Sequence, residues 1–318
     1  MAFATRVTKL LGTKYPIIQG GMAWVADYHI ASAVSEAGGL GLIAGGSAPA
    51  DFIREQVRKV RELTDKPFGV NIMLMSPHAA DIAQMVLEEK VPVVTTGAGN
   101  PGKYIPDWKA AGITVIPVIA CVSQAIRMER AGADAVVAEG TEAGGHIGEL
   151  TTMALTPQIA DAVSIPVLTA GGVADGRGIA AAFMLGAEGV QVGTRFLAAE
   201  ECNVHANYKQ AVLDCKDIGT TVTGRTTGSP CRCIKNKLAR EIVAMEKNAK
   251  ADKDEMERML TGSLRAAVVD GDDKMGSLMA GQVAGMVHKI QPAAEIIEEM
   301  FAEAAALLKG APKIADEA

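Results

Sequence analysis

Two neighbouring stretches decide the fold: PVLTAGGVADG at residues 166–176 and LGAEGVQVGTRF at residues 185–196. Each contains a short, largely apolar run, 166–169 or 189–192, with glycine directly after it or one residue later. The two runs start 23 residues apart, which leaves room for one strand, one helix and two loops. Strands that are apolar on both faces are typical of a buried parallel sheet.

The same repeat extends back to the N-terminus. Earlier apolar runs lie at residues 16–19, 39–44, 67–72, 91–95, 113–118 and 135–139. Amphipathic segments separate them and often end in glycine, the residue that favours a left-handed helix cap. Eight strand–helix units in series predict a TIM (β/α)8 barrel over residues 1–200. A doubly wound sheet would instead carry G-x-G-x-x-G after its first strand, and Gln19-Gly-Gly-Met-Ala does not match.

Residues 201–318 have a different pattern, and we expect a helical subdomain or lid packed on the barrel. Residues 234–260 are rich in Lys, Glu, Met and Ala and should be helical, whereas residues 276–288 are rich in Gly and Met. Residues 291–309 predict a terminal helix that ends at Gly310 and Pro312. The segment contains too little strand for a second independent sheet, and its tail is expected to cover the site.

Composition narrows the class of function. The chain carries 31 Lys and Arg against 37 Asp and Glu, a net charge of −6, which argues against a nucleic-acid-binding protein. No stretch is predicted to be a signal peptide or a membrane span. The five cysteines fit neither a disulfide framework nor a zinc spacing, so we expect a cytoplasmic, reducing location and no metal. Cys231 and Cys233 are interpreted as reduced thiols in a loop.

The expected active site lies at the carboxyl ends of the barrel strands. Residues there are rich in glycine and poor in charge, which suits a large planar ligand contacted mainly by backbone. The glycines at 171–172 and 193 follow the last two strands, and their exposed N–H groups predict a phosphate site. The alternative is that they form only tight turns.

The loop after the sixth strand, EGTEAGGHIG at residues 139–148, supplies the candidate catalytic residue. His146 stands among glycines that would let its imidazole approach a ligand, and histidine can exchange protons near neutral pH. The alternative is an ordinary surface histidine. Glu139 and Asn71 end two strands and could hydrogen-bond a ligand, or could simply be solvated.

Several motifs together resemble the flavin-dependent enoyl-acyl-carrier-protein reductases (reductase II), which belong with the nitronate monooxygenases. They are GGMAW at 20–24, GGLG at 38–41, PFGVNI at 67–72, TTGAGNP at 95–101, AGGHIG at 143–148, AGGVADG at 170–176, VGTRF at 192–196 and MAGQ at 279–282. The resemblance covers residues 5–290 and specifies the flavin more firmly than the substrate.

The resemblance implies FMN, with its phosphate on Gly171, Gly172, Gly193 and Thr194. The remaining implied cofactor contacts are Gly21, Met22, Ala23, Asn71, Glu139, Gly281 and Gln282. It also implies that His146 lies beside the flavin. The implied reaction is reduction of a trans-2-enoyl thioester on acyl carrier protein by NADH or NADPH, with His146 supplying a proton or polarising the thioester carbonyl, in a homodimer.

Two other functions remain open at this point. A nitronate monooxygenase would use the same FMN, His146 as a base and oxygen as oxidant. A non-catalytic flavin-binding module would use the same glycines, with His146 structural.

A basic segment could bind the acyl carrier protein, which the resemblance implies is acidic. Five cations and no acidic residue occur in residues 225–240, namely Arg225, Arg232, Lys235, Lys237 and Arg240. They are expected to steer the carrier to the site mouth. The alternative is an ordinary solvated helix start.

Overall fold

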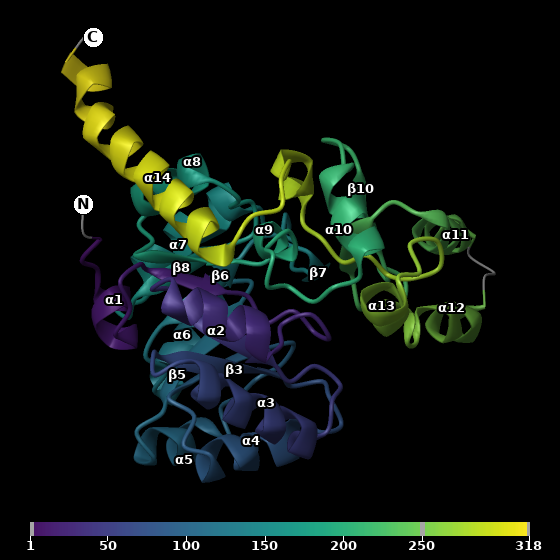
Figure 1. The fold of residues 1–318 in the computed structure, drawn as a ribbon, viewed down its shortest axis with the longest axis horizontal. Helices are drawn as coiled ribbons and strands as arrows, with labels where there is room; N and C mark the ends of the chain where they lie inside the picture. Colours follow the sequence, from purple (N-terminus) through teal and green to yellow (C-terminus); the bar gives the residue numbers. More distant parts are fainter. Residues whose placement is uncertain (1–2, 249–251, 317–318) are drawn as a thin grey trace.

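The computed structural model describes residues 3–248 and 252–316. Its centre is an eight-stranded parallel sheet in the order β1-β9-β8-β6-β5-β4-β3-β2. These strands are β1 (Ile17–Gln19), β2 (Gly41–Ala44), β3 (Phe68–Met73), β4 (Val93–Gly97), β5 (Thr114–Ile119), β6 (Val136–Glu139), β8 (Val167–Ala170) and β9 (Gly189–Val192). Figure 1 labels four of these strands, β3, β5, β6 and β8, among the helices that surround them. An isolated parallel bridge between Ile18 and Leu40 brings β1 beside β2. The predicted TIM barrel is confirmed, with all eight expected runs as its strands.

Helices between the strands cover the barrel. They are α2 (Tyr28–Glu36), α3 (Ala50–Leu63), α4 (Ala79–Glu88), α5 (Ile105–Ala110), α6 (Val122–Ala131), α7 (Thr152–Ala162) and α8 (Gly176–Met184), with α1 (Arg6–Leu11) before β1. Local signals set their ends. The Asp27 carboxylate accepts backbone N–H bonds at the start of α2, and Gly132 ends α6 at φ 98°, where a side chain would be strained.

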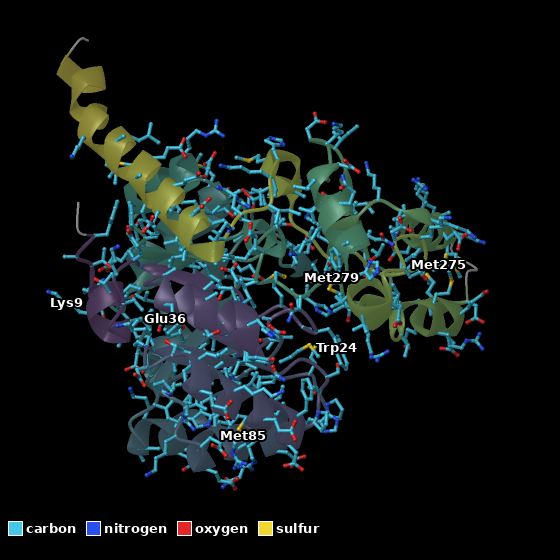
Figure 2. All side chains as sticks on the ribbon, viewed as in Figure 1. Lys9, Trp24, Glu36, Met85, Met275 and Met279 are labelled. Atoms are coloured by element: carbon cyan, nitrogen blue, oxygen red, sulfur yellow. The ribbon has the colours of Figure 1, made fainter. Side chains whose placement is uncertain are left out.

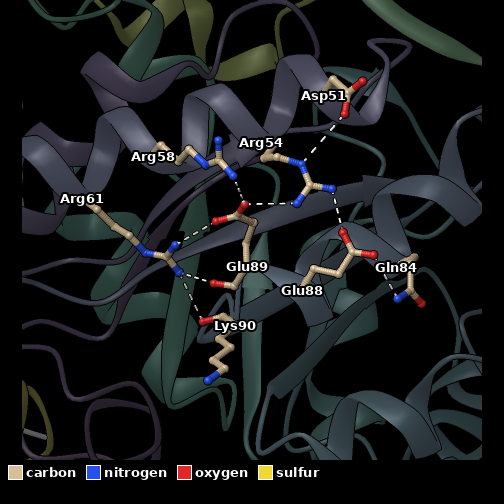
Figure 3. Close-up of polar contacts among 8 residues, drawn as sticks. All are labelled: Asp51, Arg54, Arg58, Arg61, Gln84, Glu88, Glu89 and Lys90. Atoms are coloured by element: carbon tan, nitrogen blue, oxygen red, sulfur yellow. Dashed lines mark hydrogen bonds and ion pairs between the residues drawn. The ribbon is translucent and has the colours of Figure 1, made fainter.

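An ion-pair network ties α3 to the end of α4 (Figure 3). The Glu89 carboxylate accepts bonds from Arg54 (3.1 Å), Arg58 (2.9 Å) and Arg61 (3.2 Å). Burial acts to raise the pKa of Glu89, but the bonds from Arg54 and Arg58 outweigh it and hold the pKa below its usual value. Arg61 also donates to the Glu89 carbonyl, one of the unpaired acceptors at the end of a helix.

Glu89→Gln is expected to lower the free energy of unfolding by about 1 kcal/mol, since solvent screens a surface network even when it has several members. Glu88→Gln is the matched control, because Glu88 receives a bond from only one of these arginines, Arg54, and is half exposed. Its effect should be smaller. Urea denaturation of both variants measures the difference, and equal losses would contradict a central role for Glu89.

The terminal helix α14 (Ala293–Asp316) belongs to the barrel wall. It packs on α8 and α2, as Figure 1 shows in yellow. Its Phe301 is buried and packs against two aromatic rings. The centroid of its ring lies 4.9 Å from that of Phe3 and 4.7 Å from that of Tyr15. A Cβ on Gly176, the first residue of α8, would lie 2.5 Å from the backbone nitrogen of Ala304, so only glycine permits this approach. Helix α14 is therefore the helix that follows the eighth barrel strand.

The rest of the C-terminal region is an insertion between β9 and α14. Its two ends meet, because Glu200 N donates to the Gln291 carbonyl (2.9 Å) and Gln291 N donates to the Ala198 carbonyl (3.1 Å). The buried Arg195 guanidinium also donates to the Gln291 side chain. Of the described residues, we therefore assign 3–200 and 293–316 to the barrel and 201–248 and 252–292 to the insertion, a refinement of the expected division at residue 200.

The insertion contains both helices and strand. It begins after the short helix α9 (Thr194–Leu197). Its elements are α10 (Ala206–Leu213), β10 (Thr220–Thr223), β11 (Cys231–Ile234), α11 (Lys237–Glu246), α12 (Lys253–Leu260), α13 (Ser263–Arg265) and the short helices Ala266–Asp270 and Gln282–Met286. Strands β10 and β11 form an antiparallel sheet with β7 (Gly145–His146), which lies in the loop after β6. The expected helical region is confirmed. The insertion contributes two strands to this sheet and takes the third from the barrel loop, so it does not form a second independent sheet.

Two helix boundaries also need correction. The segment 234–260 is helical in α11 and α12, but its first residue, Ile234, ends β11. Residues 249–251, between the two helices, lie outside the described part of the chain. The terminal helix does not end at Gly310 and Pro312 but runs to Asp316. A proline removes only one backbone donor, and the alanines around it favour helix.

Candidate active site

A cavity of about 570 Å³ opens at the carboxyl ends of the barrel strands, beneath the insertion. Figure 2 shows Trp24 of the barrel and Met279 of the insertion at the junction between the two. Of the predicted site residues, eleven line the cavity: Gly21, Met22, Ala23, Asn71, Glu139, His146, Gly171, Gly172, Gly193, Thr194 and Gly281. Gln282 does not; its side chain is exposed, and its backbone N–H donates to the Glu142 carbonyl (2.9 Å).

The loops after β8 and β9 form a cradle of backbone N–H groups. Gly171 and Gly172 have φ of 83° and 77°, and a Cβ on Gly171 would lie 2.8 Å from the Gly140 carbonyl oxygen. The N–H groups of Gly171, Gly172 and Gly193 donate no hydrogen bond within the described chain. Unpaired donors that border a cavity suit an anion such as a phosphate.

The insertion closes on the loop after β6 at this cradle. Gly281 N donates to the Thr194 hydroxyl (2.9 Å), and a Cβ on Gly281 would lie 2.6 Å from the Glu142 carbonyl oxygen. On the loop side, a Cβ on Gly144 would lie 2.6 Å from the Ala280 carbonyl carbon. Backbones can approach this closely only through glycine, which fixes the position of the loop that carries His146.

A polar wall continues across the barrel from the cradle. Asn71 Nδ2 donates to Thr95 Oγ1 (2.9 Å), and a Cβ on Gly21 would lie 2.3 Å from Asn71 Cβ. Gln191 also lines the cavity, and its buried Oε1 has no partner among the described residues. A buried acceptor without a partner is costly, so this oxygen suits a ligand N–H. Sequence reasoning missed Gln191 because it lies inside β9 rather than after it.

His146 projects into the mouth of the cavity. Its backbone lies in β7, held by pairing with Cys231 of β11. The side chain reaches solvent, yet the surrounding protein desolvates it enough to lower its pKa below the usual value. The imidazole is therefore neutral at pH 7 and can donate or accept a hydrogen bond there.

Glu139 ends β6 and faces the same cavity. Its carboxylate has no hydrogen bond or ion pair in the described part of the chain. Desolvation by burial raises its pKa to about 7, so the carboxyl is about half protonated at neutral pH. In that state it can donate a hydrogen bond to a ligand as well as accept one.

The raised pKa of Glu139 makes the stability of the flavin-free protein depend on pH. At a pH below the ordinary glutamate pKa, the carboxyl is protonated in both the folded and the unfolded protein. As the pH rises toward about 7, the carboxyl ionises in the unfolded protein but keeps its proton in the folded one, so the free energy of unfolding falls. The loss should be at most about 3 kcal/mol, because water that enters the cavity reduces it. Thermal melts of wild type and Glu139→Gln between pH 4.5 and 8 test this. An unchanged difference between the two proteins across that range would contradict it.

The two cysteines and the basic segment differ from expectation. Cys231 and Cys233 lie in strand β11 rather than in a loop, and burial raises their pKa values to about 12 and about 11, which makes both thiols unreactive. Arg232 is buried, and its Nε donates to the Thr141 carbonyl (3.0 Å), which fastens β11 to the loop after β6.

The remaining cations of that segment have separate partners. Arg225 pairs with Glu149 (3.2 Å), Lys237 lies 3.8 Å from Glu241, and Lys235 Nζ donates to the Ile218 carbonyl (2.6 Å). Arg232 is buried and therefore cannot belong to the expected five-charge surface, whereas the other four cations are exposed. Steering of a carrier protein by these four stays a prediction.

Comparison with known proteins agrees with this geometry. A model of the nitronate monooxygenase family matches residues 4–89 and 83–303. This chain belongs to the nitronate monooxygenase family. It is thus an oxidoreductase of a flavin-dependent family.

Three proteins similar to this chain carry different names. The solved structure of FabK from Thermotoga maritima is 50% identical, with a TM-score of 0.95 over 98% of this chain and 99% of that one. A hydroxy-methyl-oxo-octahydroindene-carboxyl-CoA dehydrogenase of Mycobacterium tuberculosis is 35% identical over 99% of this chain and its own full length. A probable nitronate monooxygenase of Staphylococcus saprophyticus is 34% identical over 96% and 98%. No helix in the described part of the chain is long and apolar enough to cross a membrane.

Proposed function

We propose that this protein reduces trans-2-enoyl thioesters on acyl carrier protein, with FMN as cofactor and NADH or NADPH as reductant. The observation that carries the proposal is the likeness to FabK, an enoyl-acyl-carrier-protein reductase II, at 50% identity over almost the whole chain. The mycobacterial relative is named for a carboxyl-CoA substrate, which is also a thioester. Both similarities favour a thioester over a nitronate as the substrate.

The residues of the cavity fit FMN. The N–H groups of Gly171, Gly172 and Gly193 would hold its phosphate, and the orphaned Gln191 Oε1 would accept a bond from an N–H of its ring. Asn71 and Glu139 would contact the ring from the ends of β3 and β6. When bound, the flavin supplies the hydride chemistry, which no protein side chain can perform.

The role of His146 follows from its protonation state. Reduction of an enoyl thioester develops negative charge on the thioester oxygen. A neutral imidazole N–H can donate a hydrogen bond to that oxygen, and desolvation of the site strengthens such a bond. The lowered pKa therefore favours polarisation of the carbonyl over delivery of a proton from an imidazolium.

One assay pair tests the proposal. Purified holoprotein should oxidise NADH or NADPH when crotonyl-CoA or a crotonyl carrier protein is added, and its flavin should bleach when the reduced nucleotide is added anaerobically. A protein that takes up no flavin, or whose reduced flavin is not reoxidised by any enoyl thioester, would refute it.

The second candidate is a nitronate monooxygenase. The matching family model and the Staphylococcus relative's name favour it. In that reaction neutral His146 would act as the base that removes a proton from a nitroalkane. Oxygen uptake that depends on a nitronate and needs no NADH would establish this function in place of the reductase.

A further inference from the structure

Arg127 of α6 is a cation without a counter-ion on the cavity wall. It is the one lysine or arginine among the described residues that line the cavity. Its side chain is exposed, and it has no hydrogen bond or ion pair to any residue in the described ranges. An unneutralised guanidinium at the mouth of a cleft attracts an anionic group of the ligand.

The strand order separates Arg127 from the flavin-phosphate cradle. The cradle follows β8 and β9, Arg127 follows β5, and β6 lies between. The loop after β6 packs directly on the start of α6, since a Cβ on Gly148 would lie 2.6 Å from Ala120 Cβ. The loop that carries His146 therefore stands between the cradle and Arg127.

The helix geometry directs this side chain toward the catalytic end. Side chains on an α-helix tilt toward its N-terminus, and α6 begins at Val122, directly after the carboxyl end of β5. Gln124, one turn earlier, lines the same wall. Its Oε1 accepts from Ala120 N (2.8 Å), which fixes the side chain at the start of the helix.

We infer that Arg127 binds a phosphate of the pantetheine arm of the thioester substrate. The inference rests on the proposed function, and it would distinguish thioesters from nitroalkanes, which carry no phosphate. Arginine suits this role because its planar fork of N–H donors matches phosphate oxygens in pairs. The pyrophosphate or 2′-phosphate of the reduced nucleotide has the same chemistry, so the experiment must separate the two sources.

Arg130 provides a matched control on the same helix. It is also exposed and has no ion pair or hydrogen bond in the described chain, but it does not line the cavity. Arg127→Gln and Arg130→Gln remove the same charge from positions three residues apart. Any effect of net charge alone would appear in both variants.

Steady-state kinetics with three crotonyl thioesters give the first test. Arg127→Gln should raise KM for crotonyl-CoA and crotonyl carrier protein on the order of tenfold, leave KM for the phosphate-free N-acetylcysteamine thioester unchanged, and keep full flavin content. Arg130→Gln should match wild type throughout. Equal effects on all three thioesters, a change confined to KM for the reduced nucleotide, or loss of flavin would each overturn the inference.

A binding measurement separates this inference from the proposed function. Calorimetry of the oxidised holoprotein should show tighter binding of 4′-phosphopantetheine than of pantetheine in wild type and no such preference in Arg127→Gln. Equal binding of the two compounds by wild type would overturn the inference even if thioesters are reduced. Absence of thioester reduction by wild type would instead overturn the proposed function, whatever the calorimetry shows.

Discussion

Replacing His146 with alanine is expected to lower kcat for enoyl thioester reduction by roughly 10²–10⁴-fold while the protein keeps its flavin. The imidazole stands at the cavity mouth on a strand that is paired with β11, so its removal takes away a donor without disturbing the cradle after β8 and β9. Stopped-flow mixing separates the two half-reactions. Flavin reduction by NADH should change much less than flavin reoxidation by crotonyl-CoA.

Two further variants and a pH profile test whether the loss of rate comes from the His146 side chain itself. His146→Gln keeps an N–H donor and should recover part of the lost rate, whereas His288→Ala, on an exposed residue outside the cavity wall, should have none of these effects. Because desolvation by the surrounding protein lowers the pKa of His146, wild-type kcat should be constant near neutral pH, and any change caused by protonation of the imidazole should appear only in acid. Unchanged reoxidation in His146→Ala would remove His146 from the mechanism.

Replacing Gly193 with alanine is expected to weaken flavin binding by roughly 5- to 150-fold, the equivalent of 1–3 kcal/mol of overpacking. Within the protein a Cβ at this position meets nothing closer than Met22 Sδ at 3.6 Å, an ordinary contact, and Gly193 has φ −110°, which any residue adopts. The flavin-free variant should therefore be as stable as wild type. Any loss of flavin affinity then reports contact between the ligand and the backbone of Gly193.

Gly112→Ala supplies the complementary control. Gly112 has φ 76° and open space around it, far along the chain from the cradle, at the end of α5. Alanine there should lower stability by about 1 kcal/mol through backbone strain alone and leave flavin affinity unchanged. Fluorescence titration of apoprotein with FMN, together with thermal melts, measures both quantities. Full flavin affinity in Gly193→Ala would place the phosphate elsewhere.

The barrel could be predicted from sequence because its information is local. Each strand is a short apolar run, each helix is amphipathic, and the repeat of both fixes the architecture. The glycines of the cradle and His146 were found in the same way, from their positions after strands. Gln191 was not found, because a polar residue within a strand gives no local sign that its side chain faces a cavity.

The features that sequence missed depend on contacts between distant segments. Residues 145–146 form a strand only because β11, more than eighty residues later, pairs with them. Arg232 resembles a surface cation in sequence and becomes buried through its bond to Thr141. The amphipathic pattern of α14 predicts a helix but not the surface on which it packs.

The position of α14 has a consequence for how the chain is made. Phe301 packs against Phe3 and Tyr15, so the first and last segments share one core. Before α14 has been synthesised, the faces of α8 and α2 that it covers are exposed to solvent and to chaperones. The helical wall of the barrel can be completed only after the codons for α14 have been translated. A chain that stops at residue 292 should therefore accumulate as aggregates, even though it retains every residue of the catalytic cavity.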